Sequence, residues 1–122
     1  MGIRLAIHFD AWCYFKGNVM TLLEKQMLFS RMFARLLLYA ESLGYQITMG
    51  EGYAYPDDHR HIEGSCHYQR LAHDINLFKS GVYLTETEDH RVLGEYWEAM
   101  GGSWGGRFSD GNHYSLEHNG MR

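Results

Sequence analysis

Cysteines, prolines and long apolar runs are all scarce in this chain of 122 residues. Its two cysteines, Cys13 and Cys66, are far apart in the sequence, and Pro56 is its one proline. Two distant cysteines do not make a disulfide framework, so a disulfide-stapled secreted domain is excluded and a reducing compartment is expected. The longest apolar run, around residues 36–38, is flanked by charged residues and is too short to span a membrane.

Positive charge is limited as well. The net charge is -4 at pH 7, and the sequence contains no run of lysine and arginine. Both observations argue against a nucleic-acid partner. The motifs of serine hydrolases, P-loop proteins and dinucleotide-binding proteins are missing. The first nineteen residues lack the apolar core and cleavage site of a signal peptide. We therefore expect no membrane partner, and a protein made in the cytoplasm.

The regular part of the sequence begins abruptly at residue 20. Residues 1–19 are rich in aromatic residues and show no clear period, so they are either an extra N-terminal strand or an upstream extension before a natural start at Met20. The abrupt change favours the extension. Thr21 and Glu24 then form a Thr-x-x-Glu capping box. We treat residues 20–122 as one domain.

Apolar residues at three- and four-residue steps predict a helix over residues 22–43, which Gly44 ends. Alternating or short apolar segments predict strands at 45–49, 71–78, 82–84 and 113–116, with a hairpin turn at 79–81. A second helix is expected within 85–100, and residues 54–64 read as a long polar loop. This order indicates an α+β fold in which a small antiparallel sheet is backed by helices.

Histidine is unusually frequent, with eight residues, and two of them occur in informative places. His67 precedes Asp74, which lies inside a predicted strand on the face opposite Ile75 and Leu77. A carboxylate there is either solvated on an exposed face or held by a partner such as a metal ion. The spacing of this pair alone leaves both interpretations open.

A second pair, Asp110 and His113, follows about forty residues later. A carboxylate three residues before a ligand histidine can act as a general base without binding the metal. Asp110 is also an ordinary residue for the start of a tight turn. Glu117 and His118 offer a competing base and ligand, and His113 and His118 would point to opposite faces of a continuing strand.

The two pairs together resemble a known family. Ser65-x-His67, Ala72-x-Asp74 and the ending Trp104-Gly-Gly-Arg-Phe108 with Asp110-x-x-His113-Tyr114 are similar to the motifs of D-Ala-D-Ala carboxypeptidases and phage L-alanyl-D-glutamate endopeptidases. The resemblance runs from about residue 20 to the C-terminus. It implies a hedgehog/DD-peptidase-like α+β domain in which His67, Asp74 and His113 bind Zn²⁺ and Asp110 is the general base.

One position departs from the family pattern. After the Gly-Tyr pair the family commonly has an arginine that stabilises the oxyanion, and this chain has Ala54. Zinc would have to act alone there, or Arg60, Arg70 or a loop histidine would substitute. Among the aromatic residues, we expect Trp97 in the core, whereas Trp104 is a candidate for a cleft wall as well as for packing.

The resemblance implies a zinc peptidase that hydrolyses an amide bond in peptidoglycan stem peptides, as a phage or prophage endolysin. Such an enzyme would be made in the host cytoplasm and released to the wall by a separate permeabilising protein, or carried by the virion. The alternative is a catalytically weakened member of the family that serves as a wall-binding or virion module. Ala54 is the residue that favours this alternative.

Overall fold

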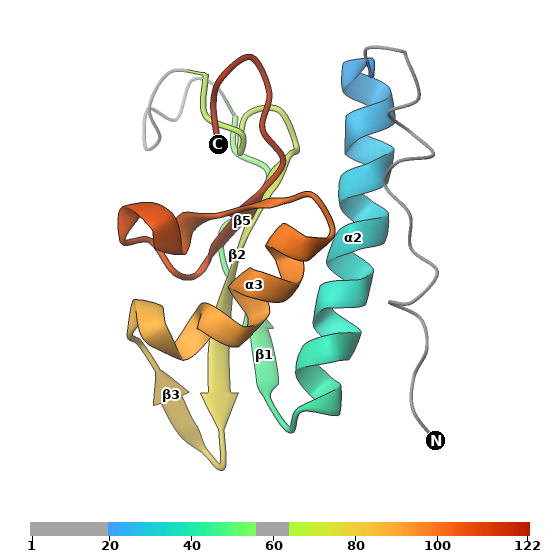
Figure 1. Cartoon of the computed structure of the whole chain (residues 1–122). Coiled ribbons are helices and arrows are strands. Elements are labelled where there is room, and N and C mark those ends of the chain that lie inside the picture. Colours follow the sequence, from blue (N-terminus) through green and yellow to red (C-terminus); the bar gives the residue numbers. More distant parts are fainter. Residues whose placement is uncertain (1–19, 56–63) are drawn as a thin grey trace.

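The computed structural model describes residues 20–55 and 64–122 (Figure 1). This part of the chain is an α+β fold, as the sequence predicts, with two helices against a five-stranded antiparallel sheet. In chain order the elements are α2 (Leu22–Ser42), β1 (Gln46–Met49), β2 (Ala72–Lys79), β3 (Val82–Leu84), the 3₁₀ helix η2 (Thr87–His90), α3 (Arg91–Ala99), β4 (Ser103–Trp104), the 3₁₀ helix η3 (Gly105–Phe108) and β5 (His113–Ser115).

Helix α2 begins at the predicted capping box. The backbone N–H of Glu24 donates to Oγ1 of Thr21 at 3.1 Å, and the N–H of Thr21 donates to Oε1 of Glu24 at 2.9 Å. Two of the N–H groups that a helix start leaves without partners are thereby satisfied. The helix ends before Gly44, which has a φ of 88°, a left-handed conformation that glycine adopts without steric cost.

Strand β2 is the centre of the sheet. It pairs with β1 along one edge and with both β3 and β5 along the other, and β4 extends the sheet beyond β5. The β2–β3 connection is the predicted hairpin. Because side chains alternate along a strand, Ile75 and Leu77 are buried against the helices while Asp74 lies on the opposite face.

Both helices cover the apolar face of the sheet. In Figure 1, α3 lies across β2 and beside α2. Their buried side chains form one core with those of β2, in which the largest residues are Trp97, Trp104 and Tyr114. Trp97 is therefore a core residue, as predicted. None of the described helices is both long enough and apolar enough to cross a membrane.

Trp104 is packed inside the protein, so of the two roles that the sequence left open, packing is the one observed and the cleft wall is not. Its ring is 1% exposed and fits between two glycines, since a Cβ at Gly94 or at Gly106 would lie 2.1 Å from ring atoms. Its indole N–H donates to the carbonyl of Gly111 at 2.7 Å. The residue thereby anchors the turn that follows η3.

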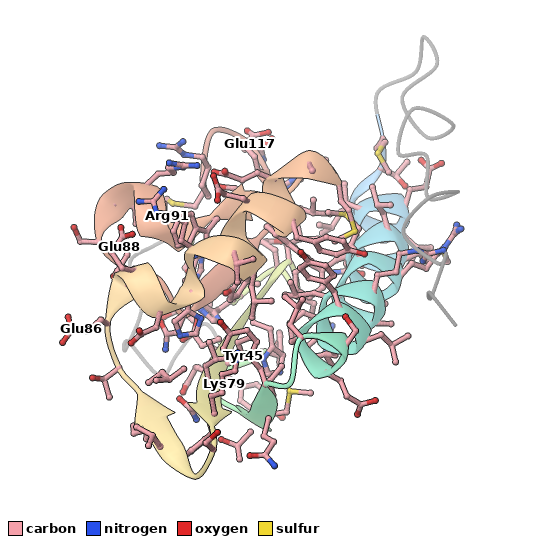
Figure 2. The ribbon with its side chains drawn as sticks, turned by 60° about the horizontal axis from the view of Figure 1, so that its bottom comes forward. Tyr45, Lys79, Glu86, Glu88, Arg91 and Glu117 are labelled. Atoms are coloured by element: carbon pink, nitrogen blue, oxygen red, sulfur yellow. The ribbon has the colours of Figure 1, made fainter. Side chains whose placement is uncertain are left out.

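Two of the cations labelled in Figure 2, Lys79 and Arg91, have a partner nearby. Arg91 makes a bidentate ion pair with Glu88, at 2.7 and 2.6 Å, and the ammonium of Lys79 lies 4.5 Å from the ring centroid of Tyr45. These are exposed surface contacts of small energetic value.

Two details of the fold differ from the sequence-based expectation. The second helix begins with a 3₁₀ turn at Thr87, and its α-helical part starts at Arg91. The two-residue strand β4 was not expected, because a strand so short carries no periodic pattern. The long loop expected over 54–64 falls mostly outside the described residues, as does the segment 1–19.

Candidate metal centre

Three side chains from separate parts of the sequence converge on the polar face of the sheet. His67 lies in the turn before β2, Asp74 lies in β2, and His113 is the first residue of β5. One potential ligand atom from each residue lies within 4.8 Å of the others. The structure therefore brings together the three residues that the sequence nominates, and a group of this kind can hold a metal ion.

The distances from the two histidines to Asp74 suit a common ion. Nε2 of His67 lies 3.3 Å from Oδ1 of Asp74, and Nδ1 of His113 lies 3.2 Å from the same oxygen. Zn²⁺ with bonds of 2.0–2.1 Å in a tetrahedral arrangement separates its ligand atoms by about 3.3 Å. Both spacings are longer than the 2.7–2.9 Å typical of a charge-assisted hydrogen bond. Two imidazoles and one carboxylate also leave one position of a tetrahedral ion open for water or substrate.

The ring of His67 is oriented by a backbone group on its far side. Its Nδ1 donates to the carbonyl of Gly52 at 2.7 Å, which leaves Nε2 as the ring nitrogen directed at Asp74. A Cβ at Gly52 would lie 2.8 Å from Nε2 of His73, so a larger residue there would require that ring to move. The turn itself is tied to helix α2, since Gln26 donates to the carbonyl of Gln69 at 2.8 Å.

Electrostatics favour an ionised Asp74. Burial raises the pKa of this carboxyl, but the hydrogen bonds and charges of His113 and His67 outweigh that effect and lower the pKa to about 2. Burial also opposes protonation of His67, yet the contacts with Asp74 and the Gly52 carbonyl, together with the charge of Glu51, raise its pKa overall. Without a metal ion, the pair therefore favours a proton on the ring beside an ionised carboxylate.

His113 is held by packing rather than by a second hydrogen bond. Its side chain is buried, and its Nδ1 faces Asp74. Its Nε2 is the one buried side-chain nitrogen or oxygen without a hydrogen-bond partner in the described part of the chain. If Nδ1 holds a metal, Nε2 must carry the ring proton. The position of His113 thus depends on strand β5 and on the neighbouring ring of Phe108, whose centroid lies 6.0 Å away.

Asp110 lies beside this group on an exposed turn. Its carbonyl accepts from the N–H of His113 at 3.1 Å, and its own N–H donates to the carbonyl of Gly105 at 2.9 Å. Its pKa is raised by partial loss of solvent and by the charge of Asp74, against the opposing effects of His113 and His67. A carboxylate with this pKa shift at the edge of a metal site is suited to accept and return a proton.

The turn that carries Asp110 depends on close backbone approaches. A Cβ at Gly105 would lie 2.2 Å from the carbonyl oxygen of Asp110, so this position requires glycine. Ser109 has a φ of 63°, which is uncommon for a residue with a side chain. Together with the Trp104–Gly111 hydrogen bond, these contacts explain why a Trp-Gly-Gly sequence precedes the proposed base.

A polar cavity of about 190 Å³ adjoins the same turn. Its lining includes Asn76, His90, Ser109 and Asp110. Asn76 occupies the same face of β2 as Asp74, two residues further on. None of the three converging residues lines this cavity, so Asp110 is the residue that the cavity shares with the surroundings of the centre.

The other candidate residues lie apart from the three ligands. His118 contacts Nζ of Lys25 at 3.2 Å and is not part of the group, which favours His113 over the competing histidine. Cys66 points away, as expected, and its buried thiol lies 3.3 Å from the carbonyl oxygens of Leu116 and Met121, either of which can accept its one proton. Burial raises the pKa of this thiol to about 11. His59, Arg60 and His61 lie outside the described residues.

Ala54 is buried, with 1% of its surface exposed, and its N–H donates to the carbonyl of His67 at 3.2 Å. This position therefore contributes packing and a backbone contact to the centre, and no cation. The sequence did not reveal this contact or the one from Gly52, because hydrogen bonds to backbone groups thirteen and fifteen residues away leave no signature in residue type. No protein-family model and no curated protein matches this chain.

Proposed function

We propose that this protein is a zinc-dependent peptidase that hydrolyses an amide bond in the stem peptides of bacterial peptidoglycan, and that it acts as a phage or prophage endolysin. The observation that carries the proposal is the convergence of His67, Asp74 and His113 at 3.2–3.3 Å around one carboxylate oxygen. The nearby Asp110, on its exposed turn, supports hydrolysis rather than a purely structural metal site.

The ligand set fits zinc better than the common alternatives. Imidazole nitrogens with one carboxylate suit Zn²⁺, whereas Ca²⁺ and Mg²⁺ require mainly oxygen ligands. When bound at a site with an open position, zinc lowers the pKa of a water molecule and polarises a carbonyl group. His67, Asp74 and His113 would hold the ion, and the Gly52 carbonyl would keep Nε2 of His67 free of a proton.

Asp110 has the proton-transfer role in this proposal. Its carboxylate accepts a proton from the attacking water and then delivers that proton to the nitrogen of the leaving amine. The raised pKa of Asp110 helps the second half of this cycle, because a carboxyl group that holds its proton more tightly remains available as an acid. Asp74, whose pKa is lowered to about 2, stays ionised throughout and serves only as a ligand.

The substrate class rests on the resemblance of the motifs that contain the site. Ser65-x-His67 and Asp110-x-x-His113 are similar to those of peptidases that cleave D-Ala-D-Ala or L-alanyl-D-glutamate bonds. By the same analogy the protein is made in a host cytoplasm and reaches the wall through a separate permeabilising protein, or travels with the virion.

Zymography on purified peptidoglycan tests the proposal directly. The zinc-loaded full chain should clear the gel, a chelator should abolish clearing, and added zinc should restore it. The Asp110→Asn variant should retain its zinc and clear nothing. A wild-type protein that carries one zinc per chain and releases no peptide from any peptidoglycan would overturn the enzymatic proposal.

A second candidate is a family member without catalytic power that binds the wall or forms part of a virion. The buried Ala54 favours it, because this position supplies no cation for a developing oxyanion. In that case the wild type should bind zinc and sediment with insoluble peptidoglycan while leaving the stem peptides intact.

A further inference from the structure

Arg70 adopts a backbone conformation that is uncommon for a residue with a side chain. Its φ is 57°, in the left-handed region, where a Cβ costs energy and glycine does not. It lies three residues after the ligand His67, and its N–H faces the carbonyl of His67 at 3.4 Å. A residue kept in a strained conformation beside a site suggests that its side chain has a use there.

The guanidinium of Arg70 is exposed and stacks on an aromatic ring. Its Cζ lies 4.0 Å from the ring centroid of Tyr53, and the ring of Tyr55 makes an edge contact with Tyr53 at a centroid distance of 5.2 Å. Arg91 and Arg107 each have a carboxylate partner, Glu88 and Glu98. No carboxylate among the described residues pairs with Arg70.

Both members of the stack belong to segments that hold His67. Tyr53 lies between Gly52, whose carbonyl accepts from Nδ1 of His67 at 2.7 Å, and Ala54, whose N–H donates to the carbonyl of His67 at 3.2 Å. Arg70 ends the turn that begins at His67. The stack is therefore carried by the two backbone segments that hold His67.

We propose that Arg70, supported by Tyr53, is a subsite that binds a free carboxylate of the peptide substrate. A guanidinium whose flat face rests on an aromatic ring keeps the N–H donors of its edge available, and two of them match the oxygens of a carboxylate. This inference rests on the proposed function and adds a substrate class to it: peptides with an unblocked carboxylate near the scissile amide.

Binding without turnover tests the subsite. The zinc-loaded Asp110→Asn protein is titrated calorimetrically with the stem tetrapeptide L-alanyl-γ-D-glutamyl-L-lysyl-D-alanine, and with the same peptide after amidation of both carboxyl groups. A second variant adds Arg70→Gly, which removes the guanidinium and relieves the left-handed backbone. The matched control adds Ser80→Gly, which relieves a φ of 51° in the β2–β3 turn.

The parent protein should bind the free carboxylate form about tenfold more tightly than the amide. Arg70→Gly should abolish this preference while its thermal stability stays equal or rises. Ser80→Gly should leave the preference intact. The subsite would be overturned if the Asp110→Asn parent bound both peptides equally well. It would also be overturned if the variant with Arg70→Gly still preferred the free carboxylate.

The result is separable from that of the proposed function. If the wild type clears peptidoglycan and Arg70→Gly does not change the preference for the free carboxylate, the peptidase is kept and the subsite is rejected. The opposite result is that the wild type clears no peptidoglycan but the preference for the free carboxylate is lost in Arg70→Gly. That result keeps the subsite and rejects the peptidase.

Discussion

Asp74 and His113 are directly opposite each other in the antiparallel pairing of β2 and β5, and their side chains meet at 3.2 Å. Opposed residues in such a pair project from the same face of the sheet with neighbouring Cβ atoms. The strand pairing thus brings two of the three proposed ligands together. The third, His67, lies in a turn, and the carbonyl of Gly52 keeps its ring in orientation.

Metal content should distinguish His113 from His118. We expect one zinc per wild-type chain and per His118→Ala chain, because His118 contacts Lys25 and not the ligand group. His113→Ala should lose the metal after dialysis, since only two ligands remain. Atomic emission on dialysed protein measures this, and zinc loss confined to His118→Ala would contradict the assignment.

Zinc should stabilise the folded protein. Binding to the folded state alone adds about 2.7 kcal/mol to the free energy of unfolding when free zinc exceeds its dissociation constant a hundredfold. Thermal unfolding of the wild type should therefore occur several degrees lower in a chelator. His67→Ala provides the control, because its midpoint should be the same with and without zinc.

Asp110→Asn should separate chemistry from metal binding. The amide is close in size to the carboxylate but cannot accept the proton, so the hydrolysis rate should fall roughly a hundred- to ten-thousandfold. Zinc content should stay at one per chain, since Asp110 is not among the three converging ligands. An Asp110→Asn protein with wild-type turnover would remove this residue from the mechanism.

Gly94→Ala should destabilise the fold. The new Cβ would lie 2.1 Å from the ring of Trp104, whose indole N–H holds the turn after η3, so helix α3 has to shift outward. We expect the free energy of unfolding, measured in urea, to fall by about 1–3 kcal/mol or more, as for other overpacked cores. The neighbouring exposed substitution Glu95→Ala is the control and should change stability little.

Acid should unfold the metal-free protein partly through Asp74. The folded-state pKa of about 2 is lower than the ordinary 3.8, so the ionised carboxylate stabilises the fold above about pH 4. That contribution, of the order of 2 kcal/mol, is lost as the pH falls from about 4 through 2. Urea unfolding between pH 2 and 5 in chelator should show this fall for the wild type. Asp74→Asn should have a flatter profile over this range.

Local rules explain why much of the fold was predictable. The capping box at Thr21, the apolar period of α2 and the β2–β3 hairpin depend on residues close in sequence, and each appears where expected. Alternation along β2 also predicted that Asp74 would lie opposite Ile75. The three converging residues were nominated from their spacing together with a resemblance of motifs.

Long-range packing decided the rest. Whether His113 or His118 joins His67 depends on the register between β2 and β5, which no local pattern specifies. Trp104 is buried because two glycines distant from each other in sequence leave room for its ring. The stack of Arg70 on Tyr53 joins segments seventeen residues apart. Residue types thus determined which chemistry was available, while tertiary contacts decided which groups meet, because a distance in space is set by the packing of the whole chain.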